Sequence, residues 1–169
     1  MDNGSIYNRD SFLTTIRHKL GSVSSVVPVQ KPEWSVSPQR NILMDASQEK
    51  LVQVLRDQCT QIHTDFFISK VGNLTATLTE ILSYYQAHSI VYSDDSRFFD
   101  YDIVNYLVDK EAFKWDNQSR DKSIQFAEQA DIGITFSDIT LAESGTVVLL
   151  NHPGQGRSVS LLPEKYIAI

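Results

Sequence analysis

The residues of this chain best suited to chemistry lie between positions 137 and 146. Ser137 and Asp138 follow an apolar run, and the turn Glu143-Ser144-Gly145-Thr146 comes a few residues later. The two segments supply carboxylates, hydroxyls and a glycine that can adopt backbone conformations other residues avoid. Exposed N–H groups and hydroxyls in such a turn can hold a phosphate or carboxylate. We therefore expect ligand-binding roles for Ser137, Asp138, Ser144, Gly145 and Thr146.

Glu143 is the candidate catalytic group of this stretch. Partial burial makes a carboxylate more basic, so Glu143 could act as a base or as a nucleophile. A structural alternative stays open, in which Ser144 and Thr146 satisfy the backbone of the turn and Glu143 pairs with a helix. The composition of the turn fits both interpretations.

A second candidate is Arg157, which ends the loop from Asn151 onward. Pro153, Gly154 and Gly156 predict a tight exposed loop there. An arginine at its end could bind an anionic group through two parallel hydrogen bonds, although a solvent-facing arginine is equally compatible with the sequence. The glycine spacing matches neither the dinucleotide-binding fingerprint nor the P-loop.

Several other kinds of site are disfavoured by composition. The four histidines are widely separated in the sequence, so we expect no metal site. The chain has one cysteine, Cys59, which lies on an apolar helical stripe and should be a small buried residue. One thiol can form no disulfide within the chain, and iron–sulfur clusters usually need four thiolates. We therefore expect no cofactor in this chain.

The charge of the chain argues against two large classes of partner. The 169 residues carry a net charge of -6, and Lys and Arg are scattered singly. Such a surface attracts neither a nucleic-acid backbone nor an anionic membrane. The longest aliphatic run, residues 147–150, is too short to span a bilayer, and the first residues lack the pattern of a signal peptide. We expect a cytoplasmic protein.

The elements that position these residues alternate along the chain. Apolar residues at helical spacing predict helices over residues 9–20, from a cap at Asp45 to residue 62, from a cap at Asn73 to residue 85, near 99–107, and over 119–129. Short β-prone runs predict strands at 66–68, 89–92, 112–115, 131–136, 146–150 and 166–169.

This alternation predicts an α/β domain with a mostly parallel sheet and helices on both faces. Because no helical segment separates the strands after Thr146, part of the sheet should be antiparallel and the sheet therefore mixed. Residues 1–40 hold too few apolar side chains for a core of their own. We interpret them as an N-terminal helix and extended arm anchored by Trp34, and residues 41–169 as the α/β domain.

The last forty residues resemble the LUD domain family. ADIGITFSDITLAESGT at 130–146, GRSVSLLP at 156–163 and YIAI at 166–169 are similar to the family's signature. Shorter upstream pieces, such as PEW at 32–34 and IHT at 62–64, resemble the lactate-utilization members found in Gram-positive bacteria, so the similarity spans nearly the whole chain. Family members continue beyond the position of Ile169, so the resemblance implies a domain shortened at its C-terminus.

The resemblance also implies a fold and a function. The fold would be of the NagB/RpiA/CoA-transferase-like group. The chain would be a cytoplasmic component of the three-protein system that oxidises L-lactate to pyruvate, as an accessory or ligand-binding subunit for a small anionic ligand. Iron–sulfur clusters would sit on cysteine-rich partner proteins, and the chain could form a homo-oligomer. Whether it is catalytic by itself stays open.

Two other functions are compatible with the sequence. One is a stand-alone CoA-transferase-like or sugar-phosphate enzyme that uses Glu143, because a glutamate is the nucleophile in CoA transferases of that fold group; fold kinship alone does not assign the role. The other is a regulatory protein that senses lactate.

Overall fold

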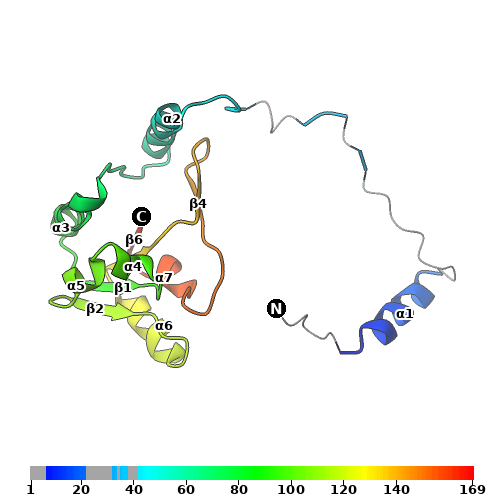
Figure 1. Cartoon of the computed structure of the whole chain (residues 1–169). Coiled ribbons are helices and arrows are strands. Elements are labelled where there is room, and N and C mark those ends of the chain that lie inside the picture. Colours follow the sequence, from blue (N-terminus) through cyan, green and yellow to red (C-terminus); the bar gives the residue numbers. More distant parts are fainter. Residues whose placement is uncertain (1–6, 22–31, 34, 38–41) are drawn as a thin grey trace. The chain divides into compact units, whose positions relative to one another are not determined.

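A computed structural model describes residues 7–21, 32–33, 35–37 and 42–169 of the chain (Figure 1). The chain divides into two compact units, Met1–Ile42 and Leu43–Ile169. In the first unit, helix α1 (Arg9–Lys19) confirms the helix predicted over residues 9–20. Trp34, which we expected to anchor the arm, lies outside the described residues.

The second unit is built on a parallel sheet of four strands in the order β2-β1-β3-β6. Val91 at its centre lies opposite Phe113 on one side and Gly133 on the other, and Gly133 lies opposite Tyr166. All four strands were predicted from the sequence to within two residues at each end. Their bounds are β1 Ser89–Tyr92, β2 Glu111–Lys114, β3 Ile132–Thr135 and β6 Lys165–Ala168.

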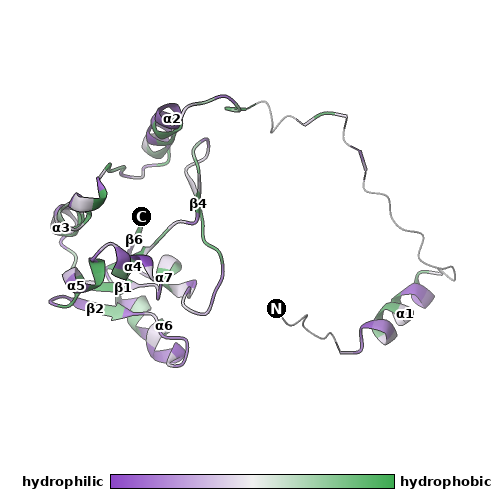
Figure 2. Cartoon of the chain, in the orientation of Figure 1, coloured by the Kyte–Doolittle hydropathy of each residue, from purple (hydrophilic) through white to green (hydrophobic). Residues whose placement is uncertain are grey.

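Helices cover both faces of this sheet, as predicted. Because side chains alternate along a strand, Ile90 faces a cluster with Leu78 and Phe98, whereas Val91 faces Ala127 and Val159. Figures 1 and 2 show α4 and α6 on opposite sides of the green, apolar strands. The first face is covered by α3 (Leu74–Tyr84), α4 (Arg97–Asp100) and α5 (Ile103–Leu107), and the second by α6 (Arg120–Gln129) and α7 (Ser158–Leu161). No helix within the described ranges is long and apolar enough to cross a membrane.

The antiparallel pairing expected among the strands after Thr146, and with it a mixed sheet, was wrong: the four strands of the main sheet are all parallel, and residues 146–148 pair instead with residues 139–141 outside that sheet. Strands β4 (Ile139–Leu141) and β5 (Thr146–Val148) form a separate two-stranded hairpin. Strand β6 is parallel to β3 because the short helix α7, which the sequence analysis did not predict, crosses between β5 and β6. β4 was also missed, since Ile139-Thr140-Leu141 is too short to give a clear period.

Two local predictions were wrong, and a third is correct in part. Residues 66–68 form no strand: residues 64–70 have no regular structure, and Phe67 and Ile68 stay exposed because no strand in the described part of the chain pairs with them. Helix α2 (Gln48–Gln61) is capped by Ser47, whose Oγ accepts a hydrogen bond from the Lys50 N–H, and not by Asp45. Asn73 is the last residue of the 3-10 turn η2 (Val71–Asn73) and stands at the N-cap position of α3, as predicted, but its side chain makes no capping hydrogen bond.

The single helix predicted near residues 99–107 is interrupted. Asp102 has φ 58, a left-handed conformation that an α-helix cannot contain, so α4 ends before it and α5 begins after it. The break changes which residues of α4 lie on the same face as the buried residues of α5. Phe98 is buried in the core, whereas the predicted Phe99 is exposed.

Candidate functional site

The direction in which the chain crosses the sheet reverses between β1 and β3. The connection after β1 leads to β2 on one side of the sheet, and the connection after β3 leads to β6 on the other. Ligands in open α/β sheets collect at the carboxyl ends of the strands, where such crossovers diverge. The structure places Ser137 and Asp138 directly after β3 at this edge, opposite Asp95, which follows β1.

Arg97 bridges the two strand ends. Its Nε and Nη2 donate to the carboxylate of Asp95 at 3.0 and 2.6 Å, and Nη2 also donates to Oδ1 of Asp138 at 2.9 Å. Its Nη1 donates to the carbonyl oxygen of Ser137 at 3.2 Å, and the guanidinium lies 5.0 Å from the centre of the Phe136 ring. We call Asp95, Arg97 and Asp138 the arginine clamp.

From the sequence, Asp94 and Asp95 before Arg97 indicate a strand-to-helix loop with capping acids, and no further role is predicted for Arg97. A capping role for Asp95 agrees with the structure, because Oδ1 of Asp95 accepts the backbone N–H of Arg97 at 2.9 Å. The bond from Arg97 to Asp138 was missed. No local pattern connects two residues 41 positions apart.

Asp138 also fixes the base of the hairpin. Its Oδ2 accepts the Leu150 N–H at 2.7 Å, and its own N–H donates to the carbonyl oxygen of Val148 at 3.0 Å. The clamp therefore joins β1, β3 and the hairpin through one guanidinium and two carboxylates. Because the acids outnumber the base, the clamp itself disfavours an anionic ligand.

The turn Glu143-Ser144-Gly145-Thr146 lies at the opposite end of the hairpin from Asp138. Gly145 adopts φ 68 and donates its N–H to the Leu141 carbonyl oxygen at 2.9 Å. The Ser144 hydroxyl donates to Oγ1 of Thr146 at 2.8 Å and accepts the Thr146 N–H at 3.4 Å. The hydroxyls thus bond within the turn, as in the structural alternative, and the full length of the hairpin separates the turn from Ser137 and Asp138.

Glu143 is exposed at the tip of this hairpin. In the described part of the chain its carboxylate has no ion pair or hydrogen bond. The tip instead makes an apolar contact, since Gly145 lies against Ile62 at the end of α2. A catalytic role for Glu143 stays a prediction.

Arg157 lines a cleft of about 1000 Å³ beside the ends of β1 and β2. Arg120, at the start of α6, and His152, on the loop after β5, share this lining. The lining contains no aspartate or glutamate, although the chain as a whole carries a net charge of -6. Basic groups without neighbouring acids raise the local concentration of anions. We call this feature the arginine cleft. Arg157 was predicted from the sequence, whereas Arg120 and His152 were not, because each of them stands alone in the sequence.

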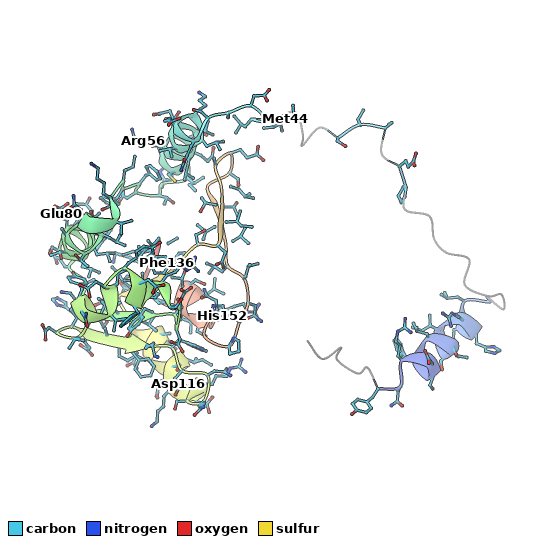
Figure 3. All side chains as sticks on the ribbon, viewed as in Figure 1. Met44, Arg56, Glu80, Asp116, Phe136 and His152 are labelled. Carbon is cyan, nitrogen blue, oxygen red and sulfur yellow. The ribbon has the colours of Figure 1, made fainter. Side chains whose placement is uncertain are left out.

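The loop that carries His152 is packed tightly onto the ends of β1 and β2. The Asp94 N–H donates to the Gly154 carbonyl oxygen at 2.9 Å, and a Cβ at Gly154 would overlap the carbonyl oxygen of Asp94. A Cβ at Gly156 would overlap the Trp115 ring. His152, which is labelled in Figure 3, accepts the Gly154 N–H on Nδ1 at 3.2 Å. The glycines therefore hold one wall of the arginine cleft in a fixed position.

Metal binding has no support in the described ranges, which contain no cluster of three or more His, Cys, Asp or Glu side chains that could hold an ion. Cys59 is buried in α2, as expected from its place on the apolar stripe, and burial raises the pKa of its thiol.

Acid should destabilise the protein through three aspartates. Bonds from the Ser89 and His88 N–H groups lower the pKa of Asp131, the Leu150 N–H lowers that of Asp138, and the Arg97 side chain lowers that of Asp95. Their stabilising contribution is present above the unfolded value near 3.9 and is lost as the pH falls through the lower folded pKa values. We expect the free energy of unfolding, from urea titrations between pH 6 and 2.5, to fall mainly below pH 4.

The matched variant is Asp131→Asn, which removes one of the three titrating groups. Its stability should depend less steeply on pH in that window than that of the wild type, whereas Asp109→Asn, at an exposed aspartate, should leave the slope unchanged. Equal slopes for wild type and Asp131→Asn would contradict the assignment.

Comparison with known proteins identifies the family. The LUD domain profile matches residues 52–169. Lactate utilization protein C from Shouchella clausii is 49% identical over 164 residues, which cover 97% of this chain and 72% of that protein. The proteins of the same name from Macrococcus caseolyticus and Halalkalibacterium halodurans are 44% and 43% identical, over 100% and 97% of this chain and 72% and 71% of their own lengths. No solved structure matches. The chain belongs to the LUD domain family.

Proposed function

We propose that this chain is a component of lactate utilization and acts in the cytoplasm as a ligand-binding subunit beside iron–sulfur partner proteins. The observation that carries the proposal is the 49% identity, over 97% of the chain, to a protein named lactate utilization protein C. The geometry supports a binding role because the arginine cleft offers Arg157 and Arg120 to an anion.

The chemistry of the chain supports a role beside partner proteins that carry the electrons. Oxidation of lactate removes two electrons, which an electron-carrying group must accept. The chain's single cysteine, Cys59, cannot alone supply the thiolates of an iron–sulfur cluster, and it is buried in α2. In the proposal, the clusters belong to the partners and this chain binds the anion.

Growth on lactate tests this function. A strain in which the gene is deleted should fail to grow on L-lactate as sole carbon source but should grow normally on glucose. Wild-type protein should restore growth, and Arg157→Gln should restore it poorly because the variant lacks a guanidinium of the cleft. Arg17→Gln, the same change on α1, is the matched control and should restore growth fully. Normal growth of the deletion strain on lactate would refute the proposal.

Association with the partners needs a separate measurement. Tagged protein purified from lactate-grown cells should bring with it proteins that show the visible absorption of iron–sulfur clusters. Recovery of the chain alone, under conditions in which the tagged protein restores growth, would count against the role as a subunit.

The role of Glu143 is tested in the same strain. In the proposal from the sequence, Glu143 is the base or nucleophile, so Glu143→Gln should abolish growth at a normal protein level. Growth equal to that of the wild type would remove Glu143 from the mechanism.

A further inference from the structure

The arginine cleft is larger and more basic than a three-carbon acid requires. Binding sites of about 300–1,000 Å³ hold ligands of drug size, and this cleft measures about 1000 Å³. We propose that it binds a phosphate ester with an apolar group. This inference rests on the proposed function in one respect only, namely that this cleft is a site for an anion. Lactate would fill a small part of it.

The charge of the cleft favours a phosphate over a single carboxylate. Arg120 and Arg157 come from two separate segments, and neither has an ion pair with any described residue. One guanidinium already donates to both oxygens of a carboxylate, so the second guanidinium would have no ligand oxygen of its own. A phosphate ester carries about -1.5 to -2 charges and three acceptor oxygens, enough to engage both.

Uncharged donors add to the two guanidiniums. Asn117, Asn151 and Ser158 share the lining with them. Together these groups offer more N–H and O–H donors than the two oxygens of a carboxylate can accept, and the three oxygens of a phosphate can accept more of them.

Gln155 provides independent evidence for a polar ligand, because its side chain carries a donor without an acceptor. Its side chain belongs to the lining, yet the residue is only 7% exposed. Its Nε2 has no hydrogen-bond partner among the described residues. A buried donor without a partner is uncommon in folded proteins, because it has lost its hydrogen bonds to water without a replacement. In the proposed complex, a ligand oxygen accepts this N–H group.

The rest of the lining calls for an apolar portion of the ligand. Leu149, Pro153, Leu161 and Leu162 face the same cleft as the basic groups, and Leu161 is 72% exposed. Covering these side chains would remove apolar surface from water, which favours binding by about 25 cal/mol per Å². A bare inorganic anion would leave that surface wet.

Titration calorimetry on the full chain can separate these contributions. Phenyl phosphate carries both a phosphate and an apolar ring, inorganic phosphate lacks the ring, and benzoate replaces the phosphate by one carboxylate. We expect phenyl phosphate to bind about tenfold more tightly than inorganic phosphate or benzoate, and more tightly than L-lactate. Lactate or benzoate binding as tightly as phenyl phosphate would overturn the inference, although an anion site, and with it the proposed function, would stand.

Variants then locate the site. Arg120→Gln and Arg157→Gln should each weaken phenyl phosphate binding about tenfold, and Arg17→Gln should leave it unchanged. Urea midpoints equal to that of the wild type would exclude misfolding as the cause. Unchanged affinity in Arg120→Gln would refute the two-arginine site. The growth test on lactate is a separate measurement. Growth can fail although phenyl phosphate binds, and growth can be normal although phenyl phosphate does not bind.

Discussion

Replacing Gly133 with alanine is expected to lower the free energy of unfolding by roughly 3 kcal/mol or more. Gly133 lies in the buried centre of β3, and α7 packs directly against its backbone. A Cβ there would overlap the carbonyl oxygen of Val159 and lie 3.0 Å from Cγ of Pro163. Neither group can move away easily, since the first is backbone and the second is a ring. Urea unfolding monitored by circular dichroism would measure the loss.

Gly72→Ala is the matched control for this prediction. Gly72 lies in the short turn before α3, and a Cβ there would meet no atom within 4 Å. The same chemical change should therefore alter the free energy of unfolding by less than about 0.5 kcal/mol. If Gly133→Ala were no more destabilising than Gly72→Ala, the close packing of α7 on β3 would be wrong.

Arg97→Gln should be the second most damaging change, with an expected loss of about 2 kcal/mol in the free energy of unfolding. The substitution removes charge-assisted bonds to Asp95 and Asp138 and the bond to the Ser137 carbonyl oxygen. It also leaves Asp95, whose side chain is 9% exposed, without its cation. Because the Arg97 side chain is 32% exposed, solvent screening keeps the effect below that of a fully buried pair.

A double-mutant cycle with Asp138→Asn would show whether the clamp couples β1 to β3. The loss in the double variant should be smaller than the sum of the two single losses, because each single change already breaks the bond between Arg97 and Asp138. Lys114→Gln provides the comparison, since it removes an ion pair to Asp94 whose partners are about half exposed and should cost less than about 1 kcal/mol. Strict additivity in the cycle would contradict the clamp.

Much of the fold was predictable because local patterns report which face of an element is buried. The apolar run of β1 and the helical spacing of Leu78, Ile81 and Leu82 in α3 each depend on one element meeting a core. The alternation of such segments was enough to predict a mostly parallel sheet covered on both faces.

The failures share a different cause. Phe66-Phe67-Ile68 has the composition of a strand, but a strand forms only where a neighbour supplies hydrogen bonds, and no strand among the described residues pairs with it. The helix break at Asp102 depends on one left-handed residue, which decides that Phe98 and not Phe99 reaches the core.

For the candidate site, the family could be recognised from the segment that contains Glu143-Ser144-Gly145-Thr146, and Asp138 and Arg157 stood out as polar groups outside regular structure. Which residues meet depends on the folded arrangement of the elements. The strand order brings Arg97 to Asp138, and the packing of α6 and α7 on one face of the sheet brings Arg120 to the cleft of Arg157. These partners are distant in the chain, and their encounter depends on the order and direction of the crossovers. That information lies in the packing of whole elements and not in the residues next to each partner.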